Sequence, residues 1–183
     1  DHDLSLHMDG ARLMNAVVAA GVSAAKFSAT VDSVWLDLSK GLGCPVGAVL
    51  SGSREFIHEA WRWKHRIGGA MRQAGIVAAA GSWALKHHVD RLAEDHENAQ
   101  LLAKRISALD GVTLVNEKVE TNMVFFDVSK TPLSAAEISA RLREKGIWIG
   151  PFGEQKMRAV THLDVRREDI IETSDALADI LIH

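Results

Sequence analysis

Apolar residues follow two different periods in the first part of the chain. They alternate with polar residues over 4–8 and form short apolar runs over 33–38 and 48–50, which predicts three short strands. They recur at helical spacing over 11–20, after Asp9-Gly10 interrupts the first alternation, and this predicts a helix. Strands that alternate with helices are typical of an α/β fold.

Longer helical patterns follow the third strand. Ser53 predicts the N-cap of a helix that ends at Gly68-Gly69. Residues 71–109 predict one long helix or two that abut, apolar at first and charged later. This change of composition, near 87–90, marks the best candidate for a domain boundary.

The boundary divides the chain into a first domain of residues 1–90 and a second domain of residues 91–183. Further strands are predicted over 112–115, 123–126, 147–149 and 157–162. Ser134 and Glu137 predict a capping box, and Asp164 or Arg167 opens a last helix. Antiparallel strands with helices on one face make the second domain α+β.

Composition limits the classes of function. The chain has 183 residues, 47% of them hydrophobic, and a net charge of −3, which disfavours binding to nucleic acid or to anionic membranes. One cysteine, Cys44, and the lack of an apolar run of membrane-spanning length indicate a soluble cytoplasmic protein. The chain begins without Met and inside a strand pattern, so we expect a fragment of a longer protein.

Lys40 is the first residue that could carry chemistry. It directly follows the strand SVWLDL and is followed by Gly41, Gly43 and Gly47, which let the backbone approach a bulky ligand. A lysine that forms a Schiff base needs a free amine, which burial or nearby positive charge can supply. A surface lysine in a glycine-rich turn would give the same spacing.

Asp9 and Arg12 form the second candidate. Asp9 lies where a predicted strand ends, and ligands of α/β sheets bind at such ends. Asp9 could keep a pyridine nitrogen protonated, and the planar guanidinium of Arg12 suits a phenolic oxygen or a carboxylate. The alternative is an acid at a helix start paired with a base three residues later.

Four segments resemble one family in order and at similar spacing. They are HMDGAR (7–12), LSKGLGCPVG (38–47), RWKHRIGGAMRQAG (62–75) and MRAVTHLDV (157–165). They closely resemble the low-specificity L-threonine aldolases, enzymes of fold type I that depend on pyridoxal 5′-phosphate (PLP). The resemblance covers nearly the whole chain but only the C-terminal half of the family.

The resemblance implies a role for each of five residues. Lys40 would be the Schiff-base lysine, Asp9 the partner of the pyridine nitrogen, and Arg12 a contact to cofactor and substrate carboxylate. Arg158 would bind the substrate carboxylate, and Arg72 would reach the cofactor phosphate, across a subunit boundary. As alternatives, Arg158 could be an edge-strand residue that faces water, and Arg72 could form a structural ion pair.

The implied reaction cleaves L-threonine, L-allo-threonine or phenylserine to glycine and an aldehyde. The implied fold is fold type I, with part of the large α/β domain in 1–90 and the small C-terminal domain in 91–183. The implied assembly is a homodimer or homotetramer with shared sites. The family's phosphate-binding Gly-Thr segment and its active-site histidines have no match here, so we expect the fragment alone to be inactive unless the N-terminal half is supplied.

Two other functions remain open. Another PLP lyase or a racemase would share the same fold. A non-catalytic fragment would need a partner.

Several other residues attract attention but indicate structure rather than chemistry. His87, His88 and His96 lie on a charged helical stretch, where solvated histidines are expected rather than a metal site. Cys44 is expected to be a small apolar filler. Three of the tryptophans of the first domain are expected to pack or to lie at a subunit interface: Trp61, Trp63 and Trp83.

Overall fold

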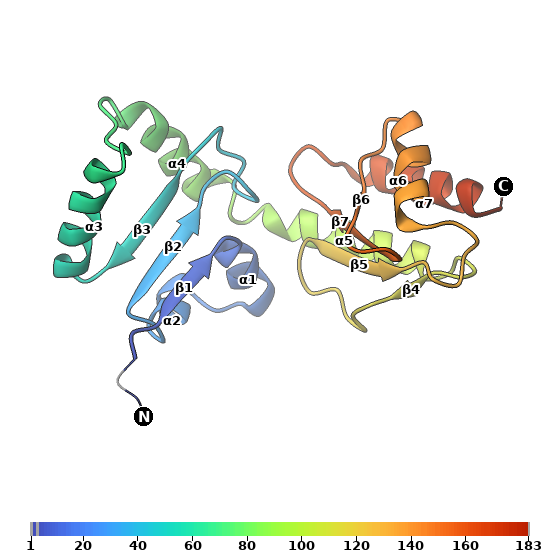
Figure 1. Ribbon diagram of the computed structural model, residues 1–183, viewed down its shortest axis with the longest axis horizontal. Helices are drawn as coiled ribbons and strands as arrows, with labels where there is room; N and C mark the ends of the chain where they lie inside the picture. The colour runs from blue at the N-terminus through green and yellow to red at the C-terminus, as the bar shows by residue number, and fades with distance from the viewer. Residues whose placement is uncertain (1, 3, 183) are drawn as a thin grey trace. The chain divides into compact units, whose positions relative to one another are not determined.

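A computed structural model describes residues 2 and 4–182 of the chain. They form two compact units that divide between Leu92 and Ala93. The first unit carries a mixed sheet with four helices, and the second carries an antiparallel sheet with three (Figure 1). Within the described residues, no helix combines the length and the apolar character that a membrane span requires.

The first unit contains a three-stranded sheet in the order β1-β2-β3. β1 and β2 run parallel, with helices α1 and α2 in the connection between them, and β3 returns antiparallel to β2. The elements are β1 (His7–Gly10), α1 (Leu13–Ala20), α2 (Ala24–Ser28), β2 (Ser33–Asp37), β3 (Ala48–Gly52), α3 (Arg54–Arg66) and α4 (Gly75–His87).

The expected break at Asp9-Gly10 is wrong, because β1 continues to Gly10. Gly10 pairs with Leu36, and a Cβ atom at Gly10 would lie 2.3 Å from the carbonyl oxygen of Trp35. The glycine therefore permits the close approach of β1 and β2 instead of ending the strand. The helix that follows begins at Leu13, two residues later than predicted.

The predicted helix after Ser53 is confirmed. The Ser53 hydroxyl accepts a hydrogen bond from the Phe56 N–H at 3.1 Å, and α3 ends at Arg66, just before Gly68. The region 71–109 contains two helices, α4 and α5 (Leu92–Ile106), rather than one.

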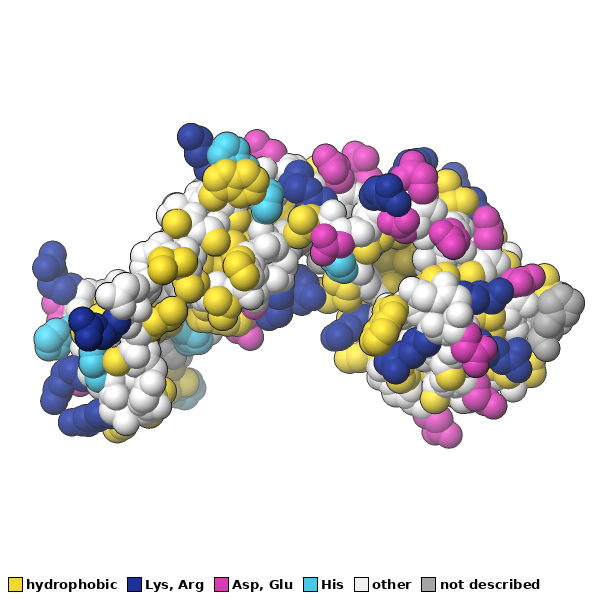
Figure 2. Space-filling model, turned by 90° about the horizontal axis from the view of Figure 1, so that it is seen from above, with side chains coloured by type: hydrophobic (Ala, Val, Ile, Leu, Met, Phe, Trp, Pro, Cys, Tyr) yellow, Lys and Arg dark blue, Asp and Glu magenta, His cyan; other side chains and the backbone are white. Residues whose placement is uncertain are grey.

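Much apolar surface of the first unit faces outward. Every residue of β3 is exposed, and α3 has no buried residue. The buried cluster is small and consists of Leu38, Leu42, Cys44 and Ala84. Figure 2 shows hydrophobic side chains gathered on the face of the first unit that it presents.

The second unit contains a four-stranded antiparallel sheet in the order β4-β5-β7-β6. Its elements are α5, β4 (Thr113–Leu114), β5 (Met123–Asp127), α6 (Ala135–Glu144), β6 (Gly150–Pro151), β7 (Lys156–Val160) and α7 (Arg167–Ile182). The predicted capping box of α6 is confirmed, since Ser134 and Glu137 bond each other's backbone N–H groups.

Only one face of this sheet belongs to the core. Val124 and Phe126 of β5 and Met157 and Ala159 of β7 are at most 5% exposed, and they cluster with residues of α5, α6 and α7. The alternate residues point to the opposite face, which is open within the second unit. The expected α+β arrangement of this part is confirmed.

The strand predicted at 147–149 is wrong. Ile149 is buried and Trp148 is 79% exposed, as in a strand, but the ladder forms two residues later, where Gly150 pairs with Arg158. The register of β7, a tertiary feature, decides which residues pair. The last helix begins at Arg167, the second of the two predicted positions.

Candidate active site at the lysine loop

The glycine-rich segment 38–47 forms a loop between β2 and β3, which we call the lysine loop. Its ends are tied together, because the Leu38 N–H donates to the Gly47 carbonyl at 3.0 Å and the Cys44 N–H donates to the Leu38 carbonyl at 2.9 Å. Leu42 and Cys44 are buried against Ala84 of α4. Cys44 is thus the apolar filler that was predicted, and the apolar side of the loop is fixed.

Asn15 packs against the lysine loop, a contact that the sequence analysis missed. Asn15 lies on α1 and is 2% exposed. A Cβ atom at Gly41 would lie 2.8 Å from Asn15 Oδ1 and 3.1 Å from Leu92 Cδ2. Glycine at position 41 therefore lets the loop backbone pack closely on α1.

The amine of Lys40 is held at the end of β2. Lys40 Nζ lies 2.9 Å from Asp37 Oδ2 and 5.2 Å from the ring centroid of Trp35. The Lys40 side chain is 39% exposed, whereas that of Asp37 is 7% exposed. Asp37 is a second residue that the sequence analysis missed, although its spacing three residues before Lys40 was a visible signal.

Asp37 is ionised in this setting. Burial raises the pKa of Asp37, but hydrogen bonds from the Ser39 hydroxyl, Lys40 Nζ and the Ser39 N–H outweigh burial, and the pKa lies below its ordinary value. Burial, helped by the charge of Asp37, raises the pKa of the Cys44 thiol. The loop thus combines a carboxylate that stays charged with a thiol that stays neutral at pH 7.

Asp9 lies on the same face of the sheet as Trp35, the residue whose ring lies under the Lys40 amine. Asp9 is opposite Trp35 in the parallel register of β1 and β2, and neighbours in such a register point to the same face. The Asp9 side chain is exposed, and its Oδ1 accepts a hydrogen bond from the Ala11 N–H at 3.0 Å. Asp9 and Lys40 therefore both lie at the carboxyl end of two parallel strands, where ligands of α/β sheets bind.

Arg12 completes this end of the sheet. It follows β1 by two residues, is half-buried, and its carbonyl accepts from the Ala16 N–H at 3.2 Å as α1 begins. The structure thus brings Asp9, Arg12 and Lys40 to one end of the first unit. An amine, a carboxylate and a guanidinium at one place can bind an anionic ligand that has a carbonyl group and a basic ring nitrogen.

Arg72 lies in an exposed turn before α4. The helix expected beside it begins at Gly75, and its N-cap residue, Ala74, supplies no side-chain hydrogen bond. Gln73 has a φ of 52°, so the backbone turns sharply between Arg72 and the helix. The first N–H groups of α4 therefore start three residues after Arg72.

Arg158 lies in the second unit, on the open face of its sheet. It is exposed and lies opposite Phe125 of β5 and Gly150 of β6. Its guanidinium carbon is 5.8 Å from the ring centroid of Phe152, which packs edge-on against Phe125 at 5.1 Å. The Phe152 ring thus lies beside the guanidinium and is itself supported by the Phe125 ring.

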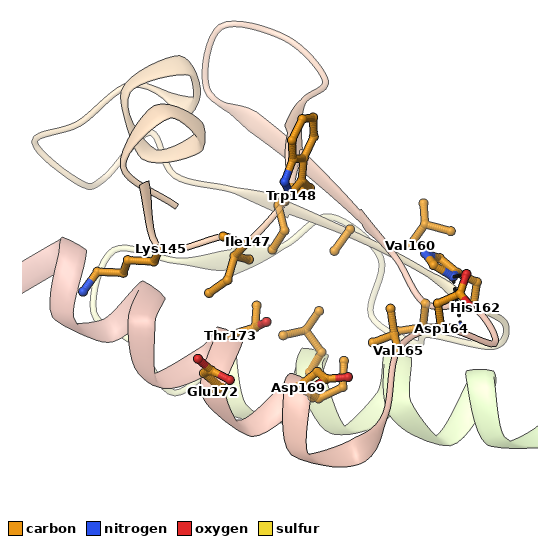
Figure 3. A pocket seen from close by; sticks show the side chains of 16 residues that line it. Lys145, Ile147, Trp148, Val160, His162, Asp164, Val165, Asp169, Glu172 and Thr173 are labelled. Carbon is orange, nitrogen blue, oxygen red and sulfur yellow. Dashed lines mark hydrogen bonds and ion pairs between the residues drawn. The ribbon is translucent and has the colours of Figure 1, made fainter. Parts of the chain in front are cut away.

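A separate pocket of about 330 Å³ lies in the second unit. Asp169, Glu172 and Thr173 of α7 face it from one side, and Ile147 and Trp148 border it on the other (Figure 3). Among the residues that the structure describes, its lining includes none of the five predicted site residues. The pocket therefore does not extend the lysine-loop site.

Two of the three noted histidines are not solvated, which corrects the expectation. His96 is 5% exposed, and burial lowers its pKa although the charge of Asp95 opposes this. His88 is half-buried and bonds the lysine loop, whereas His87 is exposed. Over the described part of the chain, the structure contains no group of three or more residues that could hold a metal ion.

The tryptophans expected to pack or to lie at an interface are largely exposed in the first unit. Trp61, Trp63 and Trp83 are 55%, 57% and 55% exposed. They do not fill the core of the first unit, and a role at a subunit interface stays a prediction.

Comparisons with known proteins place these residues in a family context. A family model described as beta-eliminating lyase matches residues 1–130. The low specificity L-threonine aldolase of Escherichia coli K12 is 42% identical over 174 residues, which cover 95% of this chain and 50% of that protein. Low-specificity L-threonine aldolase 1 of Arabidopsis thaliana is 39% identical, over 92% of this chain and 48% of that protein.

Solved structures give the same picture of the fold. A protein assigned as an L-allo-threonine aldolase from Listeria monocytogenes superposes with a TM-score of 0.78 at 26% identity, covering 96% of this chain and 52% of that one. The threonine aldolase of Leishmania major superposes with a TM-score of 0.76 at 18% identity, over 98% of this chain and 53% of that one. This chain spans about half the length of the curated relatives it matches.

Proposed function

The chain belongs to the beta-eliminating lyase family, and from this membership we propose that it supplies the lysine, the ring-nitrogen carboxylate and the carboxylate-binding arginines of a PLP-dependent L-threonine aldolase. Its fold is fold type I of the PLP-dependent enzymes, as predicted from the sequence. The observation that supports the proposal is that Asp9 and Lys40 both lie at the carboxyl end of β1 and β2, with the Lys40 amine over the Trp35 ring opposite Asp9 in the register.

The residues at the lysine loop fit PLP. The Lys40 amine can hold the cofactor carbonyl carbon covalently, and the Asp9 carboxylate is exposed at the same sheet face, free to hold a proton on the pyridine nitrogen. Arg12 would contact the cofactor as well as the substrate carboxylate. Arg72 would bind the cofactor phosphate, since its turn is exposed and precedes a helix start. PLP, when bound, supplies an electron sink for the bond that breaks at the substrate Cα.

The substrate proposed is a β-hydroxy-α-amino acid such as L-threonine, L-allo-threonine or phenylserine. Arg12 and Arg158 bind its carboxylate and orient the molecule, so that the Cα–Cβ bond can break. The hydroxyl proton leaves, the Cβ carbon departs in an aldehyde, and the remaining Cα carbon takes a proton to give glycine. Arg158 suits this role because the Phe152 ring, itself packed edge-on against Phe125, limits the directions that its guanidinium can take.

Residues beyond these 183 would complete the site. Within the described residues, β1 and β3 are the two edges of the first sheet, and β3 is exposed throughout. Large apolar side chains on α3 and α4 are also exposed, which marks a surface for association. We therefore assign residues 1–90 to part of a large domain and residues 91–183 to the small domain of a cytoplasmic homodimer or homotetramer, and we expect weak PLP binding and little activity from these residues alone.

The product assay tests the reaction. The protein, with the rest of its large domain, is incubated with PLP and L-threonine or phenylserine, and glycine and aldehyde are quantified beside ammonia and keto acid. Equal amounts of glycine and aldehyde are expected. Lys40→Ala should lose nearly all turnover, whereas Lys104→Ala, an exposed lysine on α5, should keep it. A Lys40→Ala variant with native turnover contradicts the proposal.

A second candidate is β-elimination, because the matching family model carries that description. The same residues would then release the group at Cβ and yield ammonia and a keto acid. Ammonia and keto acid without glycine would select this candidate.

A further inference from the structure

Backbone hydrogen bonds hold parts of the lysine loop together, and one further loop carbonyl, that of Leu42, accepts from a side chain at the end of α4. The Gly43 N–H donates to the Lys40 carbonyl at 2.9 Å, and the Cys44 N–H donates to the Leu38 carbonyl at 2.9 Å. The Leu42 carbonyl instead meets a side chain from the end of α4, His88, whose Nδ1 lies 2.6 Å away. The contact joins residues that are 46 positions apart in the sequence.

The chemistry of this contact fixes the proton on the ring. A carbonyl oxygen only accepts hydrogen bonds, so His88 Nδ1 must be the donor. The Trp83 indole packs edge-on against the ring at 4.8 Å between centroids, and the His88 backbone N–H, which donates to the Ala84 carbonyl at 2.7 Å, fixes the backbone that carries the ring. His88 is half-buried, so water competes weakly for the Leu42 carbonyl.

We propose that His88 is a positioning residue for Lys40. It holds the loop backbone two residues beyond the lysine, in addition to the close packing of Gly41 on Asn15, and so limits the places that the amine can occupy. This inference rests on the proposed function, in which Lys40 holds PLP. The loop would otherwise move on its glycines, since Gly43 has a φ of 69° and Gly41 has no side chain.

Three variants separate this role from general packing. His88→Ala removes the donor, and His88→Asn keeps an N–H donor at a similar distance from the backbone. His87→Ala is the matched control, because His87 is exposed and its ring also contacts Trp83, at 4.6 Å between ring centroids. A melting temperature for each variant shows whether the first unit stays folded.

The first readout needs no cofactor. Loss of one hydrogen bond should speed amide hydrogen exchange at Gly43 and Cys44 by about threefold to tenfold in His88→Ala, and leave it near the native rate in His88→Asn and His87→Ala. Long-range ¹H–¹⁵N spectra of the native protein should place the His88 proton on Nδ1. A proton on Nε2 alone, or native exchange in His88→Ala, would overturn the inference.

The second readout concerns PLP. His88→Ala should raise the apparent Kd for PLP by about threefold to tenfold, and His88→Asn should restore it. Faster exchange in the loop with an unchanged PLP Kd would contradict a role in positioning Lys40. If the protein together with the rest of its large domain bound no PLP, the proposed function would fail, while the exchange rates would still decide whether His88 holds the loop.

Discussion

Gly41→Ala is the most direct probe of how the lysine loop is packed. The added Cβ would lie 2.8 Å from Asn15 Oδ1 and 3.1 Å from Leu92 Cδ2, both inside normal contact distance. Asn15 is 2% exposed and Leu92 is fully buried, so neither side chain can move into solvent. The loop itself must shift, or the two side chains must leave their preferred positions.

The cost follows from two opposing contributions. Overpacking of this kind costs about 1–3 kcal/mol, whereas replacing glycine by alanine recovers about 0.4–1 kcal/mol through the unfolded chain. The first unit should therefore lose about 1–2 kcal/mol of unfolding free energy. The matched control is Gly75→Ala in the first turn of α4, where a Cβ meets nothing within 4 Å, and which should be neutral or gain up to about 1 kcal/mol.

Urea unfolding followed by tryptophan fluorescence measures this effect. Trp35, Trp61, Trp63 and Trp83 lie in the first unit, and Trp148 is the remaining tryptophan of the chain, so the signal reports mainly on the first unit. The loss should shrink by at least about 0.5 kcal/mol in an Asn15→Ala background, because the closest clash is then removed. Native stability of Gly41→Ala, or the same loss in both backgrounds, would refute this account of the packing.

Three further predictions concern α6, acid stability and Arg158. Ser134→Ala removes the capping box of α6 and should lower the unfolding free energy of the second unit by about 1 kcal/mol in urea titrations. Ser129→Ala, in the exposed turn after β5, should lower it by less, and equal losses would contradict a special role for the cap. Stability should fall with acid in two steps. The folded-state pKa of His96 is lowered, so the unfolded chain binds a proton first as pH falls below 6.5, and the unfolding free energy drops. The folded-state pKa of Asp37 is also lowered, so this carboxylate adds stability above pH 3.8 that is lost as pH falls further. When unfolding is measured at each pH, His96→Gln should flatten the first step and Asp37→Asn the second. Arg158→Gln should leave the melting temperature unchanged, because the side chain is exposed, and raise KM for the amino acid by about tenfold to a hundredfold, and an unchanged KM would remove Arg158 from the site.

Local patterns predicted most of the elements. Ser53 and Ser134 cap the helices that were predicted to follow them, and short apolar segments predicted β2, β5 and β7. The segment 147–149 misled because it has the alternation of a strand, while pairing depends on the register of a neighbour more distant in the sequence. The end of β1 was mispredicted at Gly10, because the sequence does not distinguish a glycine that permits close approach of two strands from a glycine that ends a strand.

The candidate site was partly visible in the sequence. The lysine loop and Asp9 stand at ends of predicted strands, so their place at one sheet edge follows from topology. His88 and Asn15 touch the loop from elements that are distant in sequence, and spacing along the chain gives no sign of such contacts. His96 was different, because it falls on the buried stripe of α5 with Leu92 and Ala99, a spacing that could have been read from the sequence.

The central claim is that Lys40 is the residue that holds PLP. The protein is incubated with saturating PLP, reduced with borohydride, digested, and the label on each lysine is quantified by mass spectrometry. We expect Lys40, whose side chain is 39% exposed, to be labelled far more than Lys118, whose side chain is 78% exposed. The reason is that PLP reacts with the lysine at its binding site rather than with the most exposed lysine. Labelling that rises with exposure, with Lys40 no higher than Lys118, would contradict it.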